Sequence, residues 1–512
     1  MRQLSAHDAS FLFSDTTHSN ANVTLIHIYN QSTAPGGKLR FKTILAHIES
    51  RLERLPAFRQ RLRRVPLDLD FPYWVDDENF DLEYHVRHLA LPKPGDWRQF
   101  CIQVSRIHAR PLDLNRPLWE IYVIEGLDSF LDLPRGSFAL LAKTHHAAID
   151  VENGSEITML LHDLHAGPVK GEPPAPWFPE APPGLLAMAS RGMVHSLSAA
   201  ARLAGPLGRV VRRVAPRALK AAGEWLLQPA HVPVTRFNSV VSPHRVFETR
   251  RFALDEFKAA RTLVAGASVN DVVLAVCGGA LRRYLDGHDE LPQASLSAMT
   301  PLYLRAPGAA ASARPDLTWV RVQLGTDLTD PVQRLARICE QTGSSELASR
   351  AVGARELTDL ERHAPAATLA IAGKLLGRAL RGIGRRAPLA SCTVTNVPGP
   401  SAPLYLCGAR MTYFSAMMPV ADGMGLVFAV TSYNGQVVIS PTSCRELMPD
   451  PEYFAQCVRD SFQELLGAAR ALQAKHDRPE AARLARRAVP APTAARRRAS
   501  RAGTRSPTSR VA

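Results

Sequence analysis

Long uncharged apolar runs are missing from this chain of 512 residues. Nowhere do roughly 18 apolar residues follow one another, which argues against a helix that spans a membrane. The opening stretch, MRQLSAHDASFLFSD, has no apolar core between a basic segment and a cleavage site. We therefore expect no secretory signal and a cytoplasmic protein that is either soluble or peripheral to a membrane.

Cysteine is sparse and irregularly spaced. The chain holds seven cysteines and no CxxC pair, and several lie in apolar runs such as VVLAVCGGAL around Cys277. An odd number of scattered thiols is typical of reduced, packed cysteines in a cytoplasmic protein. The pattern fits neither a disulfide framework nor a zinc site, so we expect no metal.

Acidic residues are scarce at the C-terminal end. Residues 476–512 hold ten arginines and two acidic residues, which is about half of the net charge of +15. Because this tail has almost no large apolar residue, we expect it to be disordered. Two roles stay open for it, a solubilising extension or contact with an anionic surface. We expect no nucleic-acid partner.

Composition divides the rest of the chain into three regions. Residues 1–165 and 233–475 each alternate strand-like with helix-like patterns, which predicts two mixed α/β domains. Residues 166–232 begin with seven prolines within 19 residues and continue as a basic Ala/Leu/Arg stretch. The first part predicts a linker. The second predicts either a helical hairpin packed on the body or an amphipathic segment that rests on a lipid surface.

Several elements follow from periodicity and turn chemistry. Residues 22–30 and 137–146 have the short apolar character of buried strands, and residues 41–64 show helical spacing. Residues 268–285 predict a buried helix whose Gly-Gly pair indicates close packing. The dipeptide Asn434-Gly435 predicts a hairpin turn.

Two adjacent histidines close the second of these strands. His145 and His146 are followed, after Ala-Ala-Ile, by Asp150. Successive side chains on a strand point to opposite sides, so only one imidazole should enter a given pocket. A neutral imidazole can accept the proton of a hydroxyl that attacks a carbonyl, and the chain has no Gly-x-Ser-x-Gly nucleophile elbow. The pattern favours general-base catalysis without a covalent intermediate; a metal site and a buried polar pair are the alternatives.

Segments along the body resemble, in order, those of the bacterial wax ester synthase/diacylglycerol acyltransferase family. HHAAID resembles its HHxxxD motif, and the further segments are LSAHDASFLF, RPLWE, SVNDVVLAVCGGALRRYL, TVTNVPGP and ADGMGLVFAVTSYNG. The resemblance implies a mixed α/β, two-domain fold like that of chloramphenicol acetyltransferase, with an active-site tunnel between the domains. It also implies acyl-CoA-dependent esterification of diacylglycerol, of a long-chain fatty alcohol, or of both.

Carried onto this sequence, the resemblance makes His146 the catalytic base, His145 its less essential neighbour and Asp150 a structural aspartate. Asn270 and Asp271 would support the site from the second domain. The other candidates for substrate binding or support are Asn396, Asp422, Gly423 and Trp119. Acyl-CoA is implied as a co-substrate, with no bound cofactor, and contact with a membrane or lipid-body surface is consistent with the basic segments.

One position departs from the family pattern. The motif continues with glycine after its aspartate, whereas this chain has Val151. Glycine permits a close backbone approach that a β-branched valine resists. The departure leaves open a slower enzyme, an altered substrate, or a catalytically weak protein that binds lipid surfaces. An HHxxxD acyltransferase of secondary metabolism is the remaining alternative.

Overall fold

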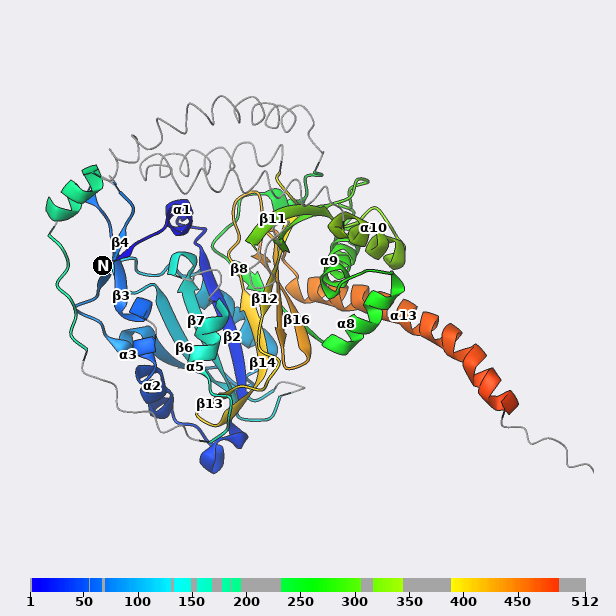
Figure 1. Cartoon of the computed structure of the whole chain (residues 1–512), viewed down its shortest axis with the longest axis horizontal. Coiled ribbons are helices and arrows are strands. Elements are labelled where there is room, and N and C mark those ends of the chain that lie inside the picture. The colour runs from blue at the N-terminus through cyan, green and yellow to red at the C-terminus, as the bar shows by residue number, and fades with distance from the viewer. Residues whose placement is uncertain are drawn as a thin grey trace, which may run out of the picture.

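A computed structural model describes the chain over residues 2–54, 56–66, 70–129, 133–148, 154–167, 177–184, 186–194, 232–304, 316–343 and 388–487. Within these ranges two large β-sheets stand beside each other, with helices on their faces (Figure 1). A small three-stranded sheet lies at one end. Asp150 and Val151 fall outside the described residues, as do residues 195–231 and 488–512. No helix in the described ranges is long and apolar enough to cross a membrane.

The first large sheet has the strand order β13-β14-β2-β7-β6-β5, antiparallel throughout except between β5 and β6. Along β7, Leu140 and Ala142 join a core on one face, whereas Ala139 and Leu141 join a core on the other. Helices α2 and α5 contribute to the first core and α4 to the second, so both faces of the sheet are covered. The bounds are β2 Asn22–Asn30, β5 Val86–Ala90, β6 Trp119–Leu127, β7 Ser137–His145, β13 Tyr405–Leu406, β14 Ala409–Met417, α2 Phe41–Glu49, α4 Trp97–Ala109 and α5 Gly154–Leu161.

Two strands of this sheet come from the C-terminal half of the chain. Strand β14 pairs with β2, and β13 pairs with β14. On its other side β14 lies against the second sheet, where the hydroxyls of Ser415 and Ser440 are 2.8 Å apart. The predicted C-terminal domain of residues 233–475 is therefore not self-contained, because residues 405–417 complete the N-terminal sheet. The local pattern of a strand does not specify which strand it will pair with.

The second large sheet has the order β11-β10-β12-β15-β16-β8, with β9 also paired to β16. Apolar side chains of this sheet form one hydrophobic core with buried side chains of helices α8, α9, α10 and α13. Figure 1 shows these helices together on the side of the sheet that faces away from the first sheet. The bounds are β8 Arg245–Phe247, β9 Arg250–Ala253, β10 Ser297–Leu304, β11 Asp316–Gln323, β12 Cys392–Pro398, β15 Val427–Tyr433, β16 Gln436–Cys444, α8 Leu254–Ala260, α9 Val269–Asp286, α10 Pro331–Gly343 and α13 Pro451–Arg487.

Local predictions within this half are confirmed. Helix α9 is buried on most sides, and a Cβ added to Gly278 would collide with the carbonyl of Leu324. The Gly-Gly pair therefore permits the close packing that the sequence indicated. Strands β15 and β16 form the predicted hairpin, with positive φ angles of 45° at Asn434 and 77° at Gly435.

The predicted helix over residues 41–64 is wrong in its second half. Helix α2 ends at Glu49, two 3-10 turns follow, and residues Gln60–Arg63 form strand β3. Pro56 opens the second turn. Proline has no backbone N–H and disfavours helical geometry in the residue before it, which ends the helical periodicity there.

The small sheet has the order β1-β4-β3, with β1 Arg2–Gln3, β3 Gln60–Arg63 and β4 Tyr73–Asp76. Part of the predicted linker runs along it. The Arg59 guanidinium lies 5.1 Å from the centre of the Trp177 ring, and the Glu180 backbone N–H donates to Asp76 at 3.1 Å. Met188 is fully buried. Residues 177–194 are therefore attached to the N-terminal half.

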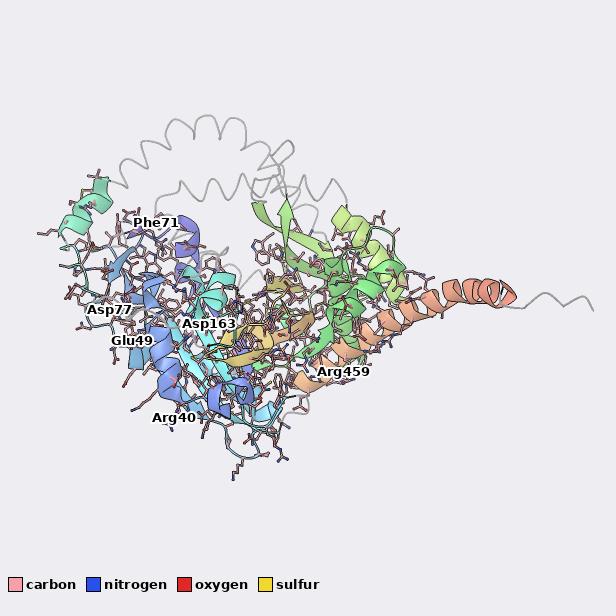
Figure 2. All side chains as sticks on the ribbon, turned by 60° about the horizontal axis from the view of Figure 1, so that its bottom comes forward. Arg40, Glu49, Phe71, Asp77, Asp163 and Arg459 are labelled. Carbon is pink, nitrogen blue, oxygen red and sulfur yellow. The ribbon has the colours of Figure 1, made fainter. Side chains whose placement is uncertain are left out.

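Helix α13 closes the fold. Its first half buries Phe454, Val458 and Phe462 in the core of the second sheet, and the helix then extends beyond the body (Figure 1). Figure 2 shows Arg459 on this helix and Phe71 and Asp77 at the opposite end of the molecule. The predicted disordered tail began at residue 476, but α13 continues to Arg487. Alanine, leucine and arginine favour a helix intrinsically, even where little surface is buried.

A buried histidine anchors α5, the helix that follows the His145-His146 loop. His162 Nδ1 donates to the Thr158 carbonyl at 2.5 Å, and the Tyr29 hydroxyl donates to His162 Nε2 at 2.5 Å. Burial lowers the pKa of His162 to about 4 and also lowers the pKa of His27, whose ring centre lies 5.1 Å away. Next to it Asp163, labelled in Figure 2, exchanges two backbone hydrogen bonds with β13.

We expect acid to weaken this anchor. Between pH 6.5 and about 4 the unfolded chain binds a proton at residue 162 that the folded chain does not, so stability falls as the pH falls. The loss should reach about 3 kcal/mol at pH 4 and be absent above pH 6.5. Urea unfolding of the wild type and His162→Gln from pH 7 to 4 measures it. Equal pH dependence in the two proteins would contradict the assignment.

Candidate active site

The two histidines lie where β7 ends. His145 is the last residue of the strand and its side chain is 1% exposed, whereas His146 opens a 3-10 turn and is half-buried. Their backbone N–H groups donate to the carbonyls of Leu118 and Ala21, at 3.0 and 2.8 Å. The change from strand to turn places the two imidazoles in different surroundings, in keeping with strand alternation.

The ring of His145 has a partner on each nitrogen. Nδ1 accepts a hydrogen bond from the Ala147 backbone N–H at 3.1 Å, and Nε2 lies 3.0 Å from a carboxylate oxygen of Asp15. Asp15 is the residue that ends helix α1, Ala6–Ser14. With both nitrogens engaged and the ring buried, His145 is not placed to exchange protons with a substrate.

His146 is held differently. Its ring stacks on that of Phe11 from α1, with centroids 3.9 Å apart and planes inclined by 16°. Helix α1 also lies against the 3-10 turn as a whole. The imidazole of His146 is therefore half-buried and fixed on one face by an aromatic ring, whereas that of His145 is buried. Of the two histidines, His146 is the one suited to a general base.

Two predicted residues from the second half meet each other. The side-chain amide of Asn396, on β12, donates to the side-chain oxygen of Asn270, at the start of α9, at 2.8 Å. Both residues are partly exposed. Helix α5, which follows the histidine loop, lies against β12. Asn396 therefore lies on a strand that borders the N-terminal half, where the family resemblance implies the site, and it is bonded there to Asn270 of α9.

Asp271 does not face this interface. Its carboxylate accepts hydrogen bonds from the Ser268 backbone N–H and hydroxyl, both at 2.7 Å, and from the Thr342 hydroxyl at 2.7 Å. Ser268 in turn accepts from the Asp271 N–H, which completes a capping box. Ser268 is therefore the cap, and Asp271 supports the site only through the position of α9.

Asp422 and Gly423 form a turn that joins the two halves. The Asp422 carboxylate accepts from the Val241 N–H at 3.0 Å and lies 3.4 Å from His18 Nε2. Gly423 adopts a φ of 81°, which favours glycine, and its N–H donates to the Ser239 carbonyl at 3.1 Å. His18 belongs to the loop between α1 and β2, which ends at Ala21. The turn therefore supports the loop that holds the backbone of His146.

Trp119 is a core residue. Its side chain is 2% exposed, stacks on Phe58 with centroids 4.6 Å apart and on His85 at 4.5 Å, and donates from Nε1 to the Phe58 carbonyl at 2.9 Å. The family resemblance makes Trp119 a candidate for substrate binding or support, whereas the structure packs its side chain into the core of the N-terminal half. In the NVPGP segment, the backbone N–H of Gly399 donates to the Ser432 carbonyl at 2.8 Å.

Comparison with known proteins decides the family. The model of the wax ester synthase/diacylglycerol acyltransferase catalytic domain matches residues 4–273, and that of the C-terminal domain matches residues 316–466. The chain belongs to this family. It is 30% identical over 483 residues, 94% of this chain and 92% of the relative, to a Mycobacterium tuberculosis protein named "Putative diacyglycerol O-acyltransferase Rv1760". To the one named "Putative diacyglycerol O-acyltransferase Rv2285" it is 34% identical over 402 residues, 78% and 84% of the two chains.

Solved structures agree with this wax ester synthase/diacylglycerol acyltransferase assignment. The enzyme of that name from Marinobacter aquaeolei superposes with a TM-score of 0.65 at 25% identity, covering 91% of this chain and 99% of the other. A trichothecene 15-O-acetyltransferase from Fusarium sporotrichioides has a TM-score of 0.56 at 8% identity, covering 91% and 94%. That second likeness shows the fold alone. The predicted mixed α/β, two-domain acyltransferase fold is confirmed.

Sequence reasoning missed two residues that contact the histidine pair and one buried lysine in the strand before it. Phe11 and Asp15 lie in the N-terminal segment, where only the family resemblance drew attention, and neither carries a spacing signal toward the histidines. Lys143 lies two residues before His145 and is fully buried. Its Nζ donates to the Arg110 carbonyl at 2.5 Å, and burial lowers its pKa to about 8. A lysine inside a strand pattern gives no indication that it will be buried.

Proposed function

We propose that this acyltransferase transfers a fatty acyl group from acyl-CoA to the hydroxyl of diacylglycerol, of a long-chain fatty alcohol, or of both. The observation that carries the proposal is the unequal placement of the two histidines. His145 is buried with both nitrogens engaged, whereas His146 is half-buried on the turn that follows the strand. One imidazole positions the loop, and the other lies on the turn that follows the strand, stacked on Phe11.

In the proposed reaction His146 accepts the proton of the acceptor hydroxyl while its oxygen attacks the thioester carbonyl. The C–S bond then breaks, the sulfur leaves as CoA thiolate, and the protonated imidazole returns its proton to that sulfur. The products are the ester and CoA-SH, and no acyl-enzyme forms. The Asn270-Asn396 pair and the Asp422-Gly423 turn support the site from the second half.

The experiment that tests the function uses purified protein, palmitoyl-CoA and a panel of acceptors. Free thiol and ester product are measured together for diacylglycerol, hexadecanol and a short polar alcohol. Thiol release matched by ester on either lipid acceptor supports the proposal and assigns the acceptor. Thiol release without ester would indicate a hydrolase. Lipid binding without any thiol release would favour the catalytically weak surface-binding protein.

We also propose that the enzyme meets its water-insoluble substrates at a membrane or lipid-body surface. Large apolar side chains are exposed at the end of the proline-rich stretch and just after it: Phe178 is 82% exposed, Leu186 88%, Met193 55% and Val194 68%. Such a group of apolar side chains marks an interaction surface. The net charge of +15 suits an anionic surface. This supports contact by residues 177–194.

The double variant Phe178→Ser/Leu186→Ser should bind anionic vesicles at least about tenfold more weakly, because each inserted side chain contributes roughly 1.5 kcal/mol or more. Co-sedimentation with vesicles of phosphatidylcholine and phosphatidylglycerol measures this. Ile102→Ser/Leu472→Ser removes two other exposed apolar side chains, 38% and 37% exposed, and should bind as the wild type does. Unchanged binding of the first variant would refute this surface.

A further inference from the structure

We propose that Asp15 is a positioning residue for the transfer reaction, acting on both members of the His145-His146 pair. One carboxylate oxygen lies 3.0 Å from His145 Nε2, and the other accepts the Ala21 N–H at 2.8 Å. The Ala21 carbonyl accepts the His146 N–H at 2.8 Å. A single carboxylate thus reaches the ring of one histidine and, through one residue, the backbone of the next. This proposal rests on the function proposed above.

The hydrogen bonds define the tautomer of His145. Because Nδ1 accepts from the Ala147 N–H, it carries no proton, so the proton of the neutral ring lies on Nε2. Nε2 then donates to Asp15. The opposite tautomer would place an N–H against the Ala147 N–H and leave the contact with the partly buried Asp15 carboxylate without a proton. Asp15 therefore stabilises the one tautomer in which the ring of His145 also holds the turn that begins at His146.

The same segment also orients the reacting ring. Asp15 directly follows α1, and α1 carries Phe11, whose ring stacks on that of His146. The Ala21 N–H bond to Asp15 ties the end of the α1–β2 loop to the end of the helix. Helix α1, the loop and the turn are thus joined at one carboxylate. Its loss frees the turn from the helix that orients the imidazole of His146.

Asp15→Ala should therefore lower kcat by about 10- to 100-fold, the range expected when a catalytic group moves by about 1 Å. KM for acyl-CoA should change by less than about twofold, because no substrate contact is removed. Asp15→Glu, which keeps the carboxylate, should recover part of the loss. Ser14→Ala is the matched control, since this exposed hydroxyl bonds only to the Phe11 carbonyl within α1, and it should retain full kcat.

A double-mutant cycle with His145→Ala separates positioning from general stability. If Asp15 acts largely through His145, the double variant should lose much less than the product of the two single losses. Full multiplication of the losses would overturn the proposal, as would full kcat in Asp15→Ala. Thermal unfolding of each variant gives the folded fraction at the assay temperature, and a kcat loss explained by that fraction alone would also count against a positioning role.

A readout without turnover keeps the proposal testable if the enzyme assay fails. The ¹⁵N chemical shifts of histidine-labelled protein distinguish the two tautomers, and His145→Gln identifies the signals of residue 145. The Ala147 N–H remains in Asp15→Ala and keeps Nδ1 unprotonated, so we expect the Nε2-protonated form in both proteins. The Nε2 signal should shift in Asp15→Ala, because its hydrogen bond to the carboxylate is lost. An unchanged Nε2 signal would refute the inference. Absence of thiol release by the wild type, with that shift present, would instead refute the proposed function alone.

Discussion

Replacement of His146 by alanine is expected to lower kcat for ester formation by roughly 10²- to 10⁴-fold, the contribution of a positioned general base. The half-buried ring contacts Phe11 on one face, so its removal leaves no fully buried cavity. Stability should therefore change little. Product formation from palmitoyl-CoA and the preferred acceptor, measured beside the thermal unfolding temperature, separates loss of chemistry from loss of folding.

A histidine remote from this turn serves as the control. His244 is 68% exposed and pairs with Glu446, so His244→Ala should keep wild-type kcat. Full activity of His146→Ala would remove the basis of the proposed mechanism. Loss of activity in both variants would instead indicate damage unrelated to the base.

Replacement of Trp119 by alanine is expected to destabilise the protein by about 3–5 kcal/mol, the usual effect of truncating a buried tryptophan. The side chain lies between Phe58 and His85, and its indole N–H bonds to the Phe58 carbonyl. Truncation removes both ring contacts and leaves that carbonyl unpaired inside the core. The shift of the urea unfolding midpoint measures the loss.

Trp319 provides the comparison on the second sheet. It is 45% exposed on β11, so Trp319→Ala should cost less than about 1 kcal/mol. If Trp119→Ala kept its stability and instead changed the preferred acyl-chain length, Trp119 would line the acyl site and the core assignment would be wrong.

Features that depend on neighbouring residues were predictable from the sequence. The strand over residues 22–30, the buried helix after Ser268 and the Asn434-Gly435 turn are all found in the structure. Each depends on side-chain periodicity, a cap or a turn within a few residues. The helix predicted over residues 41–64 ends at Glu49, and Pro56, which lacks a backbone N–H, opens a 3-10 turn within the predicted range.

The candidate site was also predictable only in part. The order of motifs identified the family and singled out His146, because adjacent histidines and their spacing to an aspartate are visible along the chain. The sequence could not tell that Asp271 caps a helix while its neighbour Asn270 binds Asn396. It also gave no sign of Asp15 as the partner of His145. These pairings join segments far apart in the chain.

The sequence alone determined the family and the local elements, because ordered motifs and hydrophobic periodicity can be read along the chain. Only the tertiary structure decided that β14 completes the first sheet beside β2, and that α1 and the α1–β2 loop hold the histidine turn. Strand pairing and long-range hydrogen bonds depend on which surfaces meet when the core is buried. That choice is made by the folded chain as a whole.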